Sequence, residues 1–313
     1  MKKFWQLAAA ATLAMSMLAA CGTEKETEQP NIAVEENQDA AFPVTVTDAL
    51  GKDITLEEAP DRIVSLTPSN TEILFGLGLD EEIVGVNDND NYPAQVADKT
   101  RIGGIEYNIE TIISLQPDIV FAHESSMFTF ESAIEQLEGS GVTVFVVEDA
   151  DTFEETYETI EVIGTLTDKD EEAENMIASI QSKLTDIQAK LQGVTPKTAF
   201  MVVGGGPDLY VVGQKTFMNE MLKAINVNNA VKEEGWPLYS AEQFVATNPD
   251  VIVCTYEGHD EMIKSNPAFA VMTAIQNNAV TVVDGDTTSR QGPRIADGVE
   301  ALAKAIYPEV FND

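Results

Sequence analysis

The sequence is poor in cysteine, histidine and basic residues. Its 313 residues include two cysteines and two histidines, and 18 Lys and Arg stand against 53 Asp and Glu, for a net charge of −35. Two cysteines cannot form a disulfide scaffold. Because binding to nucleic-acid phosphates needs a basic surface, we expect no nucleic-acid partner. The strong like charge also favours a monomer.

Residues that hold metals or perform covalent chemistry are equally scarce. His123 and His259 belong to no HxH, HExxH or CxxC spacing, and no GxSxG nucleophile elbow occurs. Cys254 ends the buried-strand pattern of residues 251–254, which is typical of an inert core thiol. We therefore expect no metal site, no cofactor and no enzymatic activity.

Long hydrophobic runs are absent after residue 20, so we expect the later chain not to span a membrane. Residues 1–20 begin with Lys2 and Lys3 and continue in a short apolar stretch, as secretory signals do. The stretch runs into Leu18-Ala19-Ala20-Cys21, which resembles the lipobox of bacterial lipoproteins. The resemblance implies cleavage before Cys21 and a lipid on its thiol. The alternative is a secreted protein with an incidental cysteine.

Two kinds of composition follow the signal. Residues 21–42 are rich in Glu, Gln and Asn and predict a disordered tether between the lipid and the folded body. Across the whole chain, 44% of residues are hydrophobic and 23% are charged, which is ordinary for globular proteins. We therefore expect the remainder to fold, as an N-terminal lobe over 43–166 and a C-terminal lobe over 194–313.

Strand patterns alternate with helix patterns in both lobes, which predicts parallel βαβ units. A hairpin turning at Gly51 comes first, and Ser69 or Asn70 is expected to cap the first helix. We expect strands at 44–47, 54–56, 62–66, 83–86, 118–121, 142–147, 198–203, 251–254 and 280–283. We expect helices at 71–77, 109–115, 130–137, 153–166, 217–225, 242–246 and 293–306.

An internal repeat links the two lobes. The block Glu110–Phe121 matches Glu242–Val253 without a gap, with Glu, Pro and Asp coinciding. A weaker match pairs Glu72 with Glu220 in the same order. Two matches in one order indicate a duplicated lobe.

Residues 167–193 should join the lobes. No Gly or Pro occurs until Gly193, and the apolar residues between Met176 and Leu191 follow one helical stripe, over about 26 residues. A coiled coil for self-association is the alternative, but the heptads are few. The expected fold is α/β, with two Rossmann-like lobes, each holding a small, mostly parallel sheet. One long rigid helix joins them, and a ligand cleft lies between them.

Several motifs resemble the substrate-binding lipoproteins of ABC importers, in particular the cobalamin and ferric-siderophore binding family. They are Arg62 to Glu72, Val84-Gly85-Val86 with Tyr92-Pro93, Ser114 to Asp118, Trp236-Pro237 and Pro293-Arg294-Ile295. The resemblance covers about residues 44–308. It implies a binding protein, lipid-anchored on the outer face of the cell membrane. Such a protein captures a bulky corrinoid or metal chelate and delivers it to an ABC permease dimer with its ATPase.

The ligand is expected at the carboxyl ends of the strands, between the lobes. The loops 87–92, 204–210 and 286–290 should reach it, with His123 and Tyr256. The residues that we assign to ligand binding are Ser69, Asn70, Asn89, Tyr92, Trp236 and Arg290.

Trp236 looks like the family's cleft tryptophan, and Arg290 lies in a loop that resembles the family's final cleft loop. The alternatives are a core position for Trp236 and a surface position for Arg290. An aromatic and a tryptophan of the best-known cobalamin binder are replaced by Asn89 and Gly104, and Tyr92 or Tyr107 could substitute.

Few basic residues are available near the ligand, namely Arg290 and Lys215, whereas ferric-siderophores that are strongly anionic want several. Cobalamin is therefore favoured, with a ferric-siderophore or haem as the alternative.

In this family, one exposed glutamate per lobe meets arginines on the permease. Glu110 and Glu242 are assigned to this docking because they occupy the same place in the repeat, and Glu72 competes with Glu110. Favourable placement at a helix start is the simpler explanation. Other functions considered are a metal-dependent enzyme on a bilobed α/β fold, which the shortage of His and Cys disfavours, and an adhesive surface lipoprotein.

Overall fold

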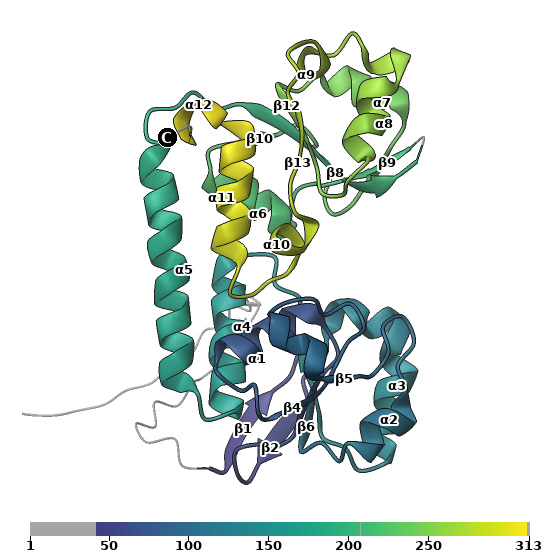
Figure 1. Cartoon of the computed structure of the whole chain (residues 1–313), viewed down its shortest axis with the longest axis vertical. Helices are drawn as coiled ribbons and strands as arrows, with labels where there is room; N and C mark the ends of the chain where they lie inside the picture. Colours follow the sequence, from purple (N-terminus) through teal and green to yellow (C-terminus); the bar gives the residue numbers. More distant parts are fainter. Residues whose placement is uncertain (1–41, 207, 312–313) are drawn as a thin grey trace, which may run out of the picture. The chain divides into compact units, whose positions relative to one another are not determined.

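The computed structural model describes residues 42–206 and 208–311 (Figure 1). The predicted signal at 1–20, the predicted lipidation site Cys21 and the predicted tether up to residue 41 lie outside the described residues. Within the described part, no helix combines the length and apolarity needed to cross a bilayer. The expected strands and helices are all present, each within three residues of its predicted bounds.

An antiparallel hairpin opens the described chain. Its strands are β1 (Val44–Thr47) and β2 (Asp53–Leu56). Gly51 has φ +76° in the turn, a conformation that a side chain disfavours, as the sequence predicted.

The N-terminal lobe contains a five-stranded sheet with the order β5–β4–β3–β6–β7, in which all neighbours are parallel. The strands are β3 (Ile63–Ser65), β4 (Ile83–Val86), β5 (Thr100–Arg101), β6 (Ile119–His123) and β7 (Val144–Val147). The helices are α1 (Pro68–Gly76), α2 (Ile109–Ser114), α3 (Met127–Gly139) and α4 (Phe153–Leu166), with 3₁₀ turns η1 (Ala94–Asp98) and η2 (Glu124–Ser126). Helices α1 and α4 cover one face, and α2 and α3 cover the other (Figure 1).

Helix α1 begins earlier than the sequence predicted. Its N-cap is Thr67, which makes no side-chain capping bond, because Pro68 already has the fixed φ that suits a first helical turn. The prediction that Ser69 or Asn70 caps this helix is therefore wrong. The Asn70 amide instead donates to the Ala122 carbonyl at 2.9 Å and ties α1 to β6.

The C-terminal lobe contains a second sheet with the order β11–β9–β8–β12–β13, and β10 also pairs with β8. Strands β10, β8, β12 and β13 are parallel, whereas β9 and β11 add antiparallel neighbours. The strands are β8 (Thr198–Gly205), β9 (Leu209–Val211), β10 (Asn228–Asn229), β11 (Leu238–Tyr239), β12 (Val251–Cys254) and β13 (Val280–Val282). The sheet is mostly parallel, as expected.

Six α-helices of this lobe lie within the described residues up to 306. They are α6 (Phe217–Ala224), α7 (Ala241–Thr247), α8 (His259–Ser265), α9 (Thr273–Gln276), α10 (Gly285–Ser289) and α11 (Ile295–Ile306), with a 3₁₀ turn η3 (Pro267–Phe269). The short α12 (Pro308–Phe311) follows. Helices α7, α8 and α9 cover one face of the sheet, and α6 and α11 cover the other.

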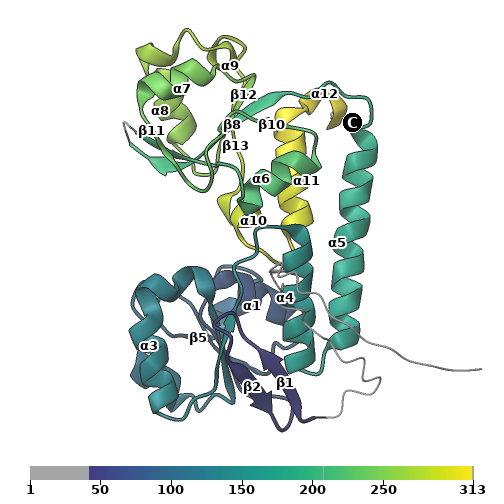
Figure 2. The same cartoon turned by 180° about the vertical axis from the view of Figure 1, so that it is seen from behind.

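The connecting helix is α5 (Asp170–Lys190), which has 21 residues rather than about 26. It is shorter because Asp168, at φ +58°, separates it from α4, and the last turn ends at Leu191. Helix α5 lies within the predicted interval 167–193 and packs along α4 and α11 (Figures 1 and 2). The lobe boundaries at 43–166 and 194–313 themselves stay a prediction.

One hydrophobic core runs through both lobes. It joins Ile73 of α1, Ile180 of α5, Met221 of α6 and Leu302 of α11, together with one face of each sheet. The outer faces of the two sheets have smaller cores of their own. The lobes are therefore two sheets on shared helices, and not two bodies on a flexible linker.

The internal repeat has the same local structure in each lobe. Asp118 accepts a hydrogen bond from the Arg62 backbone N–H at 2.8 Å, and Asp250 accepts one from the Thr198 N–H at 2.8 Å. Each aspartate fastens its own strand to the neighbouring central strand. Two residues before each aspartate the chain is left-handed, with φ +48° at Gln116 and +39° at Asn248. This equivalence supports duplication of the lobe.

Candidate functional site

The candidate site lies where the carboxyl ends of the parallel strands lead into loops. In the N-terminal lobe these loops follow β4, β6 and β7, and in the C-terminal lobe they follow β8, β12 and β13. Polar contacts between the lobes arise from α1, which follows β3, and from the loops after β4, β7 and β13, at residues 87–91, 149–150 and 286–294. Parallel α/β sheets place their ligands at these ends.

We call these polar contacts between the lobes the seam. A buried carboxylate lies at its centre. Glu72 is only 2% exposed, and its carboxylate accepts from Arg290 Nη1 at 2.8 Å and from Arg294 Nε at 2.7 Å. The hydrogen bond that Arg294 donates to Glu72 raises the pKa of Arg294 above its ordinary value. Because a second guanidinium nitrogen of Arg294 also bonds it, the Glu72 carboxylate is fully occupied. Glu72 is thus unavailable for docking, which removes the competitor of Glu110.

Arg290, which we assigned to ligand binding, is part of the same seam. Besides Glu72, its guanidinium pairs with Asp286 at 2.9 Å and donates to Asn91 Oδ1 at 2.8 Å. Its side chain is 11% exposed, so the surface alternative is wrong. A bond from Asn91 Nδ2 to Asp286 at 2.7 Å and one from Gln291 to Asp149 at 3.3 Å complete the seam.

A second buried carboxylate holds the loop after β4. Asp90 Oδ2 accepts from Thr71 Oγ1 at 2.9 Å and from the Asn87 N–H at 2.8 Å. Burial raises the pKa of Asp90 to about 6, although these hydrogen bonds oppose the rise. Arg101 donates to the carbonyls of Asn87 and Asp90, at 2.7 and 2.9 Å. The contacts of Asp90 and Arg101 therefore hold in place the loop that presents Asn89 and Tyr92.

The predicted site residues divide into exposed and buried groups. Asn89 and Tyr92 are exposed, and the Arg294 guanidinium lies 4.2 Å from the centroid of the Tyr92 ring. Trp236 is 50% exposed in the segment before β11, so the core alternative is wrong. Ser69 and Asn70 lie in the first turn of α1 and are buried, so their side chains are enclosed by the protein.

The two departures from the best-known cobalamin binder lie side by side. A Cβ atom on Gly104 would stand 3.5 Å from Asn89 Nδ2. Of the two tyrosines that could substitute, Tyr92 is exposed, whereas the Tyr107 hydroxyl donates to the Leu66 carbonyl at 2.9 Å. Tyr107 is thus engaged in the fold.

Sequence reasoning missed one exposed aromatic residue. Phe128, in the first turn of α3, is fully exposed, and α3 follows the carboxyl end of β6. Its place just after a strand end was the signal that could have found it. Tyr210 and Tyr256 are also about half exposed, after β8 and β12 respectively.

The two described histidines and the described cysteine belong to no metal-binding cluster of the described residues. Burial lowers the pKa of His123 to about 4, and its Nδ1 lies 2.9 Å from Ser125 Oγ. Burial raises the pKa of the Cys254 thiol to about 12, as befits the predicted core thiol. Within the part of the chain that the structure describes, no group of three or more His, Cys, Asp or Glu side chains could hold a metal ion.

Glu110 and Glu242 are both exposed and occupy equivalent positions. Each lies in the first turn of a short helix, capped by Asn108 in α2 and by Ser240 in α7. Each helix leads into the strand that neighbours the first strand of its lobe's parallel set, β6 beside β3 and β12 beside β8. Because a helix that connects parallel strands runs back against them, we expect both glutamates to lie toward the carboxyl-end side of their sheets.

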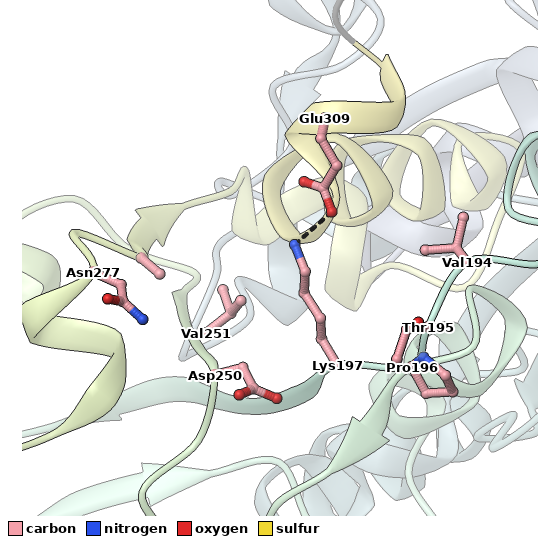
Figure 3. Close-up of a pocket in the computed structure, with 9 residues that line it drawn as sticks. Val194, Thr195, Pro196, Lys197, Asp250, Val251, Asn277 and Glu309 are labelled. Atoms are coloured by element: carbon pink, nitrogen blue, oxygen red, sulfur yellow. Dashed lines mark ion pairs between the residues drawn. The ribbon is translucent and has the colours of Figure 1, made fainter.

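A cavity of about 570 Å³ lies at the opposite end of the strands of the C-terminal sheet, by the amino ends of β8 and β12 (Figure 3). Lys197 in its wall pairs with Glu309 at 2.8 Å, and Asp250 accepts the Thr198 N–H. These charged groups are committed to the fold. The cavity is remote from the strand ends where we expected the ligand.

Comparison with known proteins identifies the family. A family model described as periplasmic binding protein matches residues 63–287. The chain is 40% identical over 317 residues to "Uncharacterized ABC transporter substrate-binding lipoprotein YvrC" of Bacillus subtilis, covering all of both chains. It is 25% identical to a cobalamin-binding protein of Halobacterium salinarum, covering 94% of this chain and 82% of that protein.

A solved structure agrees with this fold. The crystal structure of a possible iron-binding (periplasmic solute-binding) protein from Staphylococcus epidermidis aligns with a TM-score of 0.74 and 36% identity. The alignment covers 80% of this chain and all of that one. The relatives and the fold are those of substrate-binding proteins and not of enzymes. The chain belongs to the periplasmic binding protein family, as a substrate-binding protein of an ABC transporter.

Proposed function

We propose that this protein captures a bulky corrinoid or metal chelate, with cobalamin favoured, between the carboxyl ends of its two sheets. It then delivers the ligand to an ABC permease dimer with its ATPase. The names of two relatives support the ligand class, since one binds cobalamin and another is described as possibly binding iron.

The observation that carries the proposal is the set of exposed aromatic rings in the segments that follow strands of both lobes. Tyr92 and Phe128 come from the N-terminal lobe, and Tyr210, Trp236 and Tyr256 come from the C-terminal lobe. Aromatic rings offer large, rigid apolar faces with little entropy to lose on binding. Rings exposed in this number suit a broad, flat macrocycle or chelate better than a small polar solute.

The six predicted ligand-binding residues take two roles in this proposal. Asn89, Tyr92 and Trp236 are exposed and contact the ligand. Ser69, Asn70 and Arg290 are enclosed and hold the contacting loops in place through the seam and α1.

Docking to the permease is assigned to Glu110 and Glu242. Both are exposed, and neither takes part in an ion pair among the described residues. One carboxylate on each of two equivalent lobes suits a permease with two equivalent subunits that present arginines.

Attachment to the outer face of the membrane is assigned to a lipid on Cys21. The name of the Bacillus subtilis relative, a lipoprotein that matches this chain over its whole length, supports this assignment. A single polypeptide with a strong negative charge is then held at the surface as a monomer by lipid alone.

A ferric-siderophore or haem is the second candidate ligand. The Staphylococcus epidermidis relative, described as possibly iron-binding, favours it, and that relative shares more of its sequence with this chain than the cobalamin-binding one does.

Tryptophan fluorescence tests the proposal directly. Trp236 is the tryptophan that lies after the predicted signal, since the other is Trp5. Titration with cyanocobalamin, haem and a panel of ferric-siderophores should give saturable quenching by a member of the panel, and Trp236→Phe is the control. Failure of every compound to bind, by quenching and by calorimetry, would refute the proposed function.

A further inference from the structure

We infer that the ligand of this site is neutral or cationic overall, and that the site discriminates against polyanionic chelates. The inference rests on the proposed function, since it concerns the charge of whatever binds between the two sheets. It is carried by the way in which the basic side chains near the site are already paired.

Two guanidinium groups at the seam face three carboxylates. Arg290 pairs with Glu72 and Asp286, and Arg294 pairs with Glu72. Asp284, at the start of α10, also acts electrostatically on Arg294. These five groups carry a net negative charge, so neither arginine has an unmatched positive charge to offer a ligand.

Two other basic residues near the loops, Arg101 and Lys215, already have partners in the protein. Arg101 bonds the carbonyls of Asn87, Asp90 and Val96, and it also interacts with the Asp90 carboxylate. Lys215, which we considered as a ligand partner, lies 2.8 Å from Glu234. A ligand carboxylate could recruit these groups only by displacing protein carboxylates that remain nearby.

Carboxylates that form no ion pair with any described residue add to the negative field. Glu148, Asp149 and Asp151 follow β7 in succession, and Asp149 reaches the seam through Gln291. Burial raises the pKa of Asp149 above its ordinary value, and the neighbouring Glu124 raises it further. These carboxylates repel an anion, and because their side chains are exposed the repulsion weakens as salt is added. An anionic ligand must overcome it, whereas a neutral or cationic one does not.

Ligands of matched shape and different charge test the inference. One pair is cyanocobalamin, whose charges cancel, and the same corrinoid after hydrolysis of peripheral amides to carboxylic acids. The other is a neutral ferric tris-hydroxamate and an anionic ferric tris-catecholate. In calorimetry with the full chain at low salt, we expect the neutral member of a pair to bind at least about tenfold more tightly, with the ratio shrinking as salt is added.

Two double variants, one test and one control, show which carboxylates cause the preference for neutral ligands. Asp149→Asn with Asp284→Asn removes two negative charges while retaining oxygen acceptors for Gln291 and for the start of α10. We expect this variant to reduce the ratio of the affinities for the neutral and the anionic ligand several-fold. Glu171→Gln with Glu174→Gln, both exposed on α5, removes the same charge elsewhere and should leave the ratio unchanged.

The outcomes separate the inference from the proposed function. Anionic members that bind as tightly as neutral ones, or a ratio that ignores both salt and the Asp149/Asp284 variant, would overturn the charge inference while the transport function stands. If no member of either pair binds, the proposed function fails and takes this inference with it.

Discussion

Glu72 on α1 and Arg290 after α10 meet at 2.8 Å, although 218 residues separate them in the sequence. The pair joins the two lobes at the carboxyl ends of their sheets, inside a network that also contains Arg294 and Asp286. A residue that resembled a docking carboxylate is therefore a structural link between the lobes.

Glu72→Gln should destabilise the protein by about 3 kcal/mol, because it leaves two poorly hydrated guanidinium groups without their carboxylate. Urea denaturation followed by circular dichroism gives the free energy of unfolding. Glu220→Gln is the matched control, since Glu220 is the counterpart of Glu72 in the internal repeat but its ion-pair partner among the described residues is the exposed Lys223, at 3.3 Å. Its loss should cost less than about 1 kcal/mol. Equal losses in the two variants would contradict the role given to the seam.

Glu110→Lys combined with Glu242→Lys should reduce uptake of the ligand by cells at least about tenfold, because like charges would then face the permease arginines. Ligand affinity of the purified variant should not change. Glu171→Lys with Glu174→Lys makes the same change in charge on α5 and serves as the control. Uptake at the normal rate by the Glu110/Glu242 variant would show that docking uses another surface.

Acid should affect the stability of the wild-type protein and of Asp90→Asn differently. The pKa of Asp90 is raised from 3.8 to about 6, so the folded state holds this proton more tightly than the unfolded state. The resulting stabilisation is complete below about pH 4 and is lost as the pH rises through 6, and its full size is about 3 kcal/mol.

The difference in unfolding free energy between wild type and Asp90→Asn, measured from pH 4 to pH 7.5, should therefore shift against the wild type as the pH rises. Taking the difference cancels the titration of the many other carboxylates. A difference that stays flat across this range would mean that Asp90 does not titrate there.

Ligand binding should leave the solution scattering profile nearly unchanged. The lobes share one hydrophobic core, and α5 spans both without a glycine or proline between Asp170 and Lys190. Closure by a hinge needs a few residues that can absorb large backbone rotations, and this segment has none. Profiles measured with and without the ligand that fits best should superimpose, and a clear contraction on binding would contradict the rigid connection.

Local and periodic features of the fold were predictable from the sequence. Alternating strand and helix patterns, the stripe on α5 and each of the two repeated blocks at Glu110 and Glu242 are visible within short stretches of sequence. The short strands β9 and β11 were not predicted, because strands of three and two residues are too short to show an alternating pattern. Their pairing comes from contact with β8 and with each other.

The amino-acid sequence by itself determined the two α/β lobes, the helix between them and the family, because periodicity and short motifs are local properties. Only the tertiary structure decided that Glu72 and Arg290 form an ion pair with each other. It also decided that Tyr92, Phe128 and Trp236 stay exposed. Whether a charged or aromatic side chain is exposed and available to a partner depends on which distant residues fold against it. Burial and ion pairing between distant residues cannot be read from any one segment of the sequence.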